Sequence, residues 1–144
     1  MSTPLPLNEK LVKLIEQRMM ITLEGIEDTL ERIGEEREIT ELEMKENIKS
    51  FEKTFHQLFQ KWNLEIMYTL SLKNSIGFNE IKKVLGVNSR TLSDKLKFLA
   101  ESGYVKRKVD PGPPLSVEYI LTKKGRNTIL LAIPLLYYVR SEMA

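Results

Sequence analysis

The stretch Val87–Gly125 decides the fold, and it reads VNSRTLSDKLKFLAESGYVKRKVDPGPPLSVEYILTKKG. Its first part predicts a helix that begins at Asn88 or Ser89, because either side chain can accept a hydrogen bond from a free N–H of the first turn. The helix is expected to end at Gly103, since a glycine usually follows the last turn. One face should be buried, because it carries Leu92, Leu96 and Leu99 at helical spacing.

A β-hairpin is expected directly after this helix. Tyr104–Val109 and Ser116–Leu121 predict its two strands, the second with apolar residues at alternate positions. Between them, Asp110–Pro114 suits a type II turn, which takes proline second and glycine third. Thr122 then caps a further helix, and Pro134 should kink that helix because proline has no backbone N–H to donate.

Shorter elements are expected before this stretch. A helix is predicted over Leu64–Leu72, with Asn63 as its cap. A short extended segment is predicted over Ser75–Phe78, followed by a helix over Asn79–Leu85 that Gly86 ends. Two short helices joined by a tight turn and followed by a hairpin indicate a winged helix-turn-helix. The expected fold class is therefore mainly α with a small β-hairpin wing (α+β), preceded by a long N-terminal helical extension.

The extension is predicted to contain two long helices. The first is capped by Asn8 and ends near Gly34, and the second begins at Thr40, which forms a Ser/Thr-x-x-Glu capping box with Glu43. Apolar residues in both helices alternate at spacings of four and three, which predicts one apolar stripe along each helix. The stripes are Met19, Leu23, Ile26, Leu30 and Ile33, then Met44, Ile48, Phe51, Phe55, Leu58 and Trp62.

Each of these stripes needs a partner surface. The two helices can pack on each other as a hairpin, or against a second subunit. The run Ile129–Val139 is also apolar on most sides, which again points to a dimer interface. We therefore expect a homodimer with three parts: an acidic, dimerising extension over 1–60, a winged helix-turn-helix over 61–125, and a dimerising C-terminal helix over 126–144.

Charge is divided unevenly along the chain, although its formal net charge is only +2. Residues 1–60 hold 8 Lys and Arg against 13 Asp and Glu, a net charge of −5. Residues 61–144 hold 14 Lys and Arg against 7 Asp and Glu, a net charge of +7. Such asymmetry suggests that the second part faces a polyanion and the first does not.

Several classes of function are not expected. The sequence has no cysteine, and no spacing of metal ligands surrounds its only histidine, His56, so neither a disulfide nor a metal site is predicted. No Gly-rich phosphate loop or Ser/His/Asp set is present, so we expect no enzyme and no cofactor. The longest apolar run has 11 residues, against about 20 for a membrane span, and the first residues lack the pattern of a signal peptide, so neither feature is expected. A soluble, cytoplasmic protein without a membrane partner is expected.

Four stretches together carry a resemblance to a known family. They are Lys61–Trp62 with the apolar helix that follows, GFNEIKKVLG from Gly77, VNSRTLSDKLKFLAESGYVKR from Val87, and VEYILTKKG from Val117. Over roughly residues 61–140 the chain resembles the HxlR-type transcriptional regulators, within the wider MarR-like winged-helix group. The resemblance implies a dimeric DNA-binding repressor or activator. The chain departs from it by lacking the sensing cysteine of many bacterial relatives and by its longer acidic extension.

The helix after Val87 carries short polar and cationic side chains opposite its leucines. These suit a helix in the major groove of double-stranded DNA, where hydroxyls donate to phosphates and arginine reads base edges. The candidate DNA-binding residues are Ser89, Arg90, Thr91, Ser93, Asp94 and Lys97 on this helix, and Lys106, Arg107 and Lys108 on the strand that follows.

The three cations of the strand should not all point the same way. In a twisted two-stranded wing, Lys106 and Lys108 lie on one side and Arg107 on the other. The resemblance places Arg107 near the base of the wing, where it either supports the structure or holds a phosphate. The leading function is a sequence-specific DNA-binding regulator, and the alternative is a winged-helix protein-interaction module of a transcription or scaffold complex. The sequence names no small-molecule effector.

Overall fold

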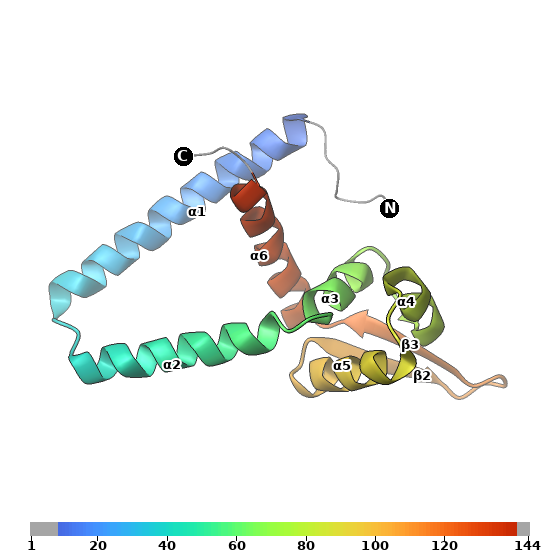
Figure 1. Cartoon of the computed structure of the whole chain (residues 1–144). Coiled ribbons are helices and arrows are strands. Elements are labelled where there is room, and N and C mark those ends of the chain that lie inside the picture. Colours follow the sequence, from blue (N-terminus) through green and yellow to red (C-terminus); the bar gives the residue numbers. More distant parts are fainter. Residues whose placement is uncertain (1–8, 141–144) are drawn as a thin grey trace. The chain divides into compact units, whose positions relative to one another are not determined.

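The computed structural model describes residues 9–140 of the 144-residue chain (Figure 1). The described residues fall into two compact units, one of Leu58–Ile133 and the other of residues 9–57 with 134–140. The elements are α1 (Glu9–Glu36), α2 (Glu41–Leu58), α3 (Asn63–Ser71), β1 (Ile76–Gly77), α4 (Phe78–Leu85), α5 (Ser89–Glu101), β2 (Val105–Asp110), β3 (Ser116–Leu121) and α6 (Lys123–Arg140). The predicted mainly helical fold with a small hairpin wing is confirmed.

The sheet of the first unit has the strand order β1-β3-β2, and both pairings are antiparallel. Tyr119 of β3 lies opposite Ile76 on one side and opposite Arg107 on the other. Because side chains directly opposite one another share a face of the sheet, these three residues form one row. Ile76 is buried in the core and Tyr119 packs against it, so the helices α3, α4 and α5 cover this face.

The hydrophobic core lies between that face and the three helices. The leucine face predicted for the helix after Val87 is confirmed, because Leu92, Leu96 and Leu99 are all buried. The predicted apolar face of α3 is also confirmed. Ile66 and Leu70 are buried in the core, and Trp62 packs against it at the edge.

The junction between α2 and α3 differs from the prediction. The apolar stripe was expected to continue as helix to Trp62, but α2 ends at Leu58. Trp62 has a left-handed backbone with φ 82° and occupies the cap position of α3 without a side-chain cap hydrogen bond. Asn63, the predicted cap, instead lies inside the first turn and is fully buried. The helix thus stops before Trp62, whose indole packs against the core.

Two of the predicted helix caps, Asn88 and Thr122, have the expected hydrogen bonds, and the predicted cap at Asn8 lies outside the described residues. Asn88 Oδ1 accepts from the backbone N–H of Thr91 at 2.8 Å, and Thr122 Oγ1 accepts from that of Gly125 at 3.0 Å. Gly103, just after α5, has φ 85°, as its predicted role requires. α6 continues past Pro134 to its end, and the kink there stays a prediction.

The capping box of α2 is confirmed in one half only. Thr40 Oγ1 accepts from the N–H of Glu43 at 3.2 Å. The Glu43 carboxylate instead accepts two hydrogen bonds from Arg37, at 2.9 and 2.8 Å, and one from the Thr40 hydroxyl at 3.2 Å. Those bonds hold the pKa of Glu43 at about 2, well below its ordinary value.

The helices of the extension keep most residues of their apolar stripes on the surface. No side chain of α2 is buried, and among the described side chains of α1 only Met19 is. Leu30 is 64% exposed and Phe51 65% exposed. The stripes therefore lack the burial that packing on each other in one chain would give them. None of the helices within residues 9–140 has the length and apolar character needed to cross a membrane.

Candidate nucleic-acid interface

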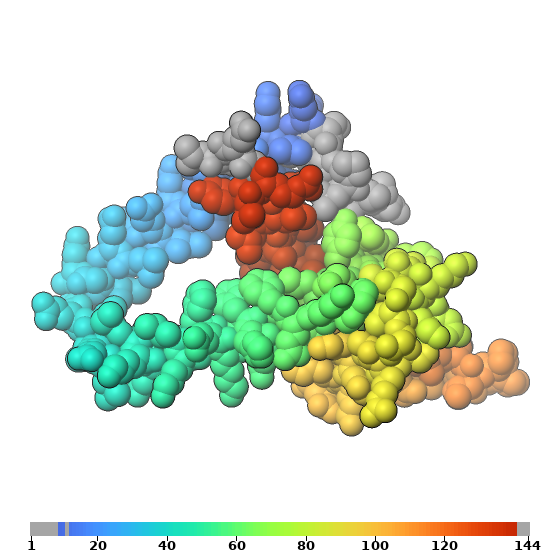
Figure 2. Space-filling view, in the orientation of Figure 1, coloured from blue at the N-terminus to red at the C-terminus, as the bar shows by residue number. Residues whose placement is uncertain are grey.

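The polar face of α5 lies on the surface of the first unit, opposite the buried leucines. The structure brings together on this one helix the six candidate residues that the sequence assigned to it. Thr91 is half-buried, and the others, Ser89, Arg90, Ser93, Asp94 and Lys97, are exposed. Figure 2 shows α5 (yellow to gold) at the surface, with the tip of the hairpin (orange) projecting beyond it.

Both ends of α5 are fixed by hydrogen bonds. At its start, the Asn88 carboxamide satisfies the first turn. At its end, the Lys124 ammonium donates to the carbonyl of Ser102 at 3.0 Å, and the Thr122 hydroxyl donates to the carbonyl of Gly103 at 2.5 Å. The same ammonium lies 4.6 Å from the centre of the Tyr104 ring. These contacts tie the end of α5 to the start of α6.

One cation of α5 is used for structure instead. Lys95 is half-buried, and its ammonium donates to Gln60 Oε1 at 3.1 Å. Gln60 lies in the turn between α2 and α3, 35 residues away in the sequence. Helical spacing carries no information on a contact between residues so far apart in the sequence. The predicted interface does not include Lys95, but the sequence could not identify Gln60 as its partner.

The hairpin separates its cations as predicted from strand alternation. Lys106 lies opposite Ile120 and Lys108 opposite Glu118, on the sheet face away from the core. The Glu118 carboxylate accepts from the Ser75 hydroxyl at 3.2 Å. Arg107, in the row of Tyr119, lies on the face that also meets α5. The structure therefore places Arg107 on the same side of the sheet as α5.

The charges of this surface are available to an anion. Within residues 9–140, the ion pairs involve none of the candidate residues on α5 or β2. Arg90, Lys97 and Arg107 are all exposed. Exposed guanidinium and ammonium groups without carboxylate partners can bind phosphate oxygens or base edges.

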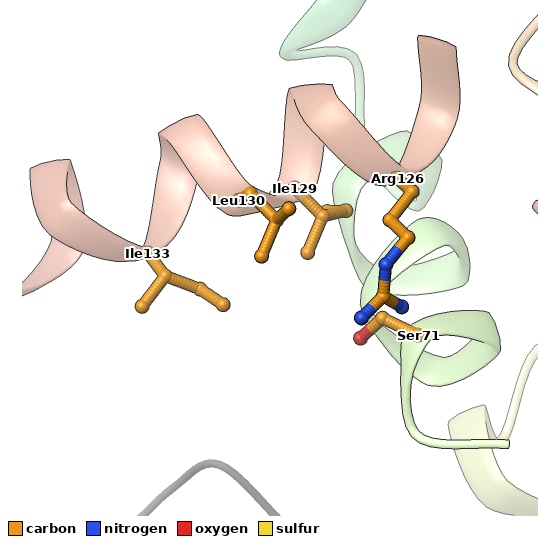
Figure 3. A pocket seen from close by; sticks show the side chains of 5 residues that line it. All are labelled: Ser71, Arg126, Ile129, Leu130 and Ile133. Atoms are coloured by element: carbon orange, nitrogen blue, oxygen red, sulfur yellow. The ribbon is translucent and has the colours of Figure 1, made fainter. Parts of the chain in front are cut away.

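A small pocket lies in the same unit. In the described part of the chain, no three His, Cys, Asp or Glu side chains are grouped as metal ligands would be. The pocket has a volume of about 90 Å³ and lies between α3 and α6. Figure 3 shows the side chains that line it, which are Ser71, Arg126, Ile129, Leu130 and Ile133. Typical ligand pockets are several times larger, at roughly 300–1,000 Å³.

Comparison with known proteins agrees with this geometry. Residues 57–140, more than half of the chain, match the HxlR-like helix-turn-helix family. The chain belongs to this family. The HxlR-like match begins in the last turn of α2 and includes the helix-turn-helix, the wing and α6, so α1 and nearly all of α2 lie outside it. Membership places the chain among helix-turn-helix transcriptional regulators.

Individual relatives of this HxlR-like protein support the assignment. An uncharacterized HTH-type transcriptional regulator of Halalkalibacterium halodurans is 44% identical over 66 residues, which are 45% of this chain and 58% of that protein. The uncharacterized HTH-type transcriptional regulator YvaP of Bacillus subtilis is 42% identical over 77 residues, 53% of this chain and 70% of that protein.

A solved structure extends the likeness to the MarR-like group. It is a MarR-family transcriptional regulator of Enterococcus faecalis, with a TM-score of 0.59 and 26% identity over 64% of this chain and 84% of that chain. The predicted resemblance to HxlR-type regulators within the MarR-like group is thus confirmed.

Proposed function

We propose that this HxlR-like protein is a transcriptional regulator that binds double-stranded DNA sequence-specifically as a homodimer. One observation carries the proposal: α5 buries its leucine face in the core and presents a face of hydroxyl and cationic side chains to solvent. A helix held this way as the second helix of a helix-turn-helix inserts into the major groove, with its N-terminal residues at the base edges.

The side chains of α5 divide into two proposed roles. Arg90 lies in the first turn, where its guanidinium can donate two hydrogen bonds to a guanine. Asp94, one turn further, can accept from a cytosine amino group or orient a neighbouring cation. The hydroxyls of Ser89, Thr91 and Ser93 and the ammonium of Lys97 are suited to phosphate oxygens, which set the register of the helix on the duplex.

The wing supplies a second proposed contact. Lys106, Arg107 and Lys108 follow one another on β2, and all three are exposed. Cations at a wing bind backbone phosphates or line the minor groove, and they contribute affinity for any duplex. Arg107 shares its side of the sheet with α5, so of the three it is best placed to act together with the recognition helix.

A homodimer is proposed because so much apolar surface is exposed in one chain. The stripes of α1 and α2 are on the surface, and α6 also exposes several large apolar residues. Monomers rarely expose contiguous apolar patches beyond a few hundred Å². A second copy with two-fold symmetry would cover such surface, and it would present two α5 helices to two half-sites of the duplex.

The test is a titration of the full chain against a random duplex and against a site selected from a random pool, at several salt concentrations. We expect tight binding to the selected site, weaker binding to the random duplex, and an affinity that falls linearly on a log–log plot against salt. Failure to bind any duplex at low salt would overturn the proposal. It would favour the alternative, a winged-helix protein-interaction module, for which the exposed stripes outside the family match provide a surface.

A further inference from the structure

The tip of the wing has a composition unlike the rest of the proposed interface. Residues 111–115 read PGPPL, and every one of them is exposed. Leu115 at its end is 69% exposed. From Asp110 to Thr122 the sequence contains no lysine or arginine. The tip therefore offers no positive charge to phosphates, and the side chains of residues 111–115 are apolar.

The tip is also held in one shape. Pro111, Pro113 and Pro114 each restrict the backbone. Gly112 adopts φ 78°, and its N–H donates to Asp110 Oδ1 at 3.1 Å, which turns that carboxylate back onto the backbone. A side chain at Gly112 would collide with the backbone of Pro114. A rigid apolar tip can enter a groove with little loss of conformational entropy.

The apolar surface continues along the hairpin toward the helices. Val109 lies opposite Val117, two residues beyond the pairing of Arg107 with Tyr119 on the same face. Val109 is exposed and Val117 half-buried. On the side of the sheet that meets α5, Arg107 is thus followed along the hairpin by the pair Val109 and Val117. The exposed Leu115 lies beyond this pair, at the end of the tip.

We propose that Leu115 enters the minor groove of bound DNA and wedges between two adjacent base pairs, kinking the duplex. This inference rests on the proposed DNA binding and adds a specificity-determining residue to it. The cations of β2 would hold the backbone beside the groove, while Leu115 meets the bases, which an apolar side chain can stack against and partly unstack. The kink is easiest at pyrimidine–purine steps, so the wedge selects such a step at a position that α5 does not read.

The experiment compares the full-length protein with Leu115→Ala on the site selected by the wild type. Duplex bending is measured by energy transfer between dyes at the two ends. Affinity is measured for the fully paired duplex and for a duplex with a mismatched base pair at the step next to the wing. The mismatch weakens base stacking at that step before the protein binds. Leu72→Ala, at the C-cap of α3 where the leucine is 38% exposed, is the control for a leucine lost away from the wing.

Leu115→Ala should reduce the bend and weaken binding to the paired duplex by about 5- to 20-fold, because stacking by the leucine no longer offsets the energy of unstacking. The wild type should bind the mismatched duplex more tightly than the paired one, because the cost of unstacking is already met there, and Leu115→Ala should lose more affinity on the mismatched duplex than on the paired one. Leu72→Ala should leave bend and affinity unchanged, and both variants should melt like the wild type.

Two results would overturn the wedge while leaving the proposed function intact. In the first, Leu115→Ala bends the duplex as the wild type does. In the second, it loses affinity equally on paired and mismatched duplexes, which would mean a plain groove contact or a surface for another protein. If the wild type binds no duplex, the proposed function itself has failed, and the wedge fails with it.

Discussion

Gly125 in the first turn of α6 lies so close to the backbone of Tyr104 that a Cβ atom at position 125 would overlap the Tyr104 carbonyl oxygen. That oxygen accepts a hydrogen bond from the N–H of Thr122 at 3.1 Å. This close approach joins the segment that follows α5 to the start of α6. Position 125 must be glycine, because the Tyr104 carbonyl oxygen belongs to the backbone and cannot rotate away from a side chain there.

Gly125→Ala should therefore destabilise the Leu58–Ile133 unit by about 1–3 kcal/mol, the usual cost of overpacking. Urea denaturation followed by circular dichroism measures this free energy of unfolding. Gly25→Ala is the control, because nothing lies within 4 Å of a Cβ there and alanine favours the helix by about 0.5–1 kcal/mol. A Gly125→Ala variant as stable as the wild type would show that the two backbones can separate freely.

Arg90→Ala should cost about 1–3 kcal/mol of binding on the selected DNA site and relax the preference at one base pair, if its guanidinium reads a guanine. A panel of duplexes with single substitutions along the site measures both effects. Asp94→Ala on the same helix should change which bases are preferred, and not simply strengthen binding by removing a negative charge. Uniform strengthening on every duplex would contradict a role for Asp94 in reading bases.

Lys106→Ala and Lys108→Ala should weaken binding to all duplexes alike, because phosphate contacts carry no sequence information. The slope of log affinity against log salt should become shallower by about one unit for each phosphate that the variant no longer binds. Salt titrations on the selected site and on a random duplex give both slopes. The division of roles fails if Lys108→Ala and Arg90→Ala give the same profile across the duplex panel.

Leu30→Asp or Phe51→Asp should dissociate the proposed dimer, because each places a charge in a stripe that a second copy would bury. Sedimentation at micromolar protein concentration should then show a monomer, whereas the wild type sediments as a dimer. Ile21→Asp is the matched control, since Ile21 is exposed on α1 but lies outside the stripe of alternating spacing. Loss of the dimer by Ile21→Asp, or a monomeric wild type, would count against the stripes as the interface.

The pKa of Glu43 should be directly measurable. Because hydrogen bonds from Arg37 lower it to about 2 from an ordinary 4.5, the pair is intact above pH 4.5 and is lost as the pH falls toward 2. A carboxyl chemical-shift titration by NMR should give a midpoint near 2, and Arg37→Ala should raise it toward 4.5. An unchanged midpoint in Arg37→Ala would show that the guanidinium is not its cause.

What the sequence determined by itself is local. The cap at Asn88, the span Ser116–Leu121 of β3 and the buried leucines of α5 follow from interactions among residues a few positions apart. The candidate residues on α5 could be grouped for the same reason, since helical spacing alone puts them on one face.

Tertiary structure alone decided the contacts between distant segments. Three features could not be predicted from the spacing of nearby residues. They are the left-handed backbone at Trp62, the pairing of Ile76 with Tyr119, and the hydrogen bond from Lys95 to Gln60. The placement of Arg107 on the side of α5 also depends on strand register, which is set when the sheet packs on the helices. Such contacts form only when burial of the core brings distant segments together. The spacing of residues along the sequence therefore does not predict them.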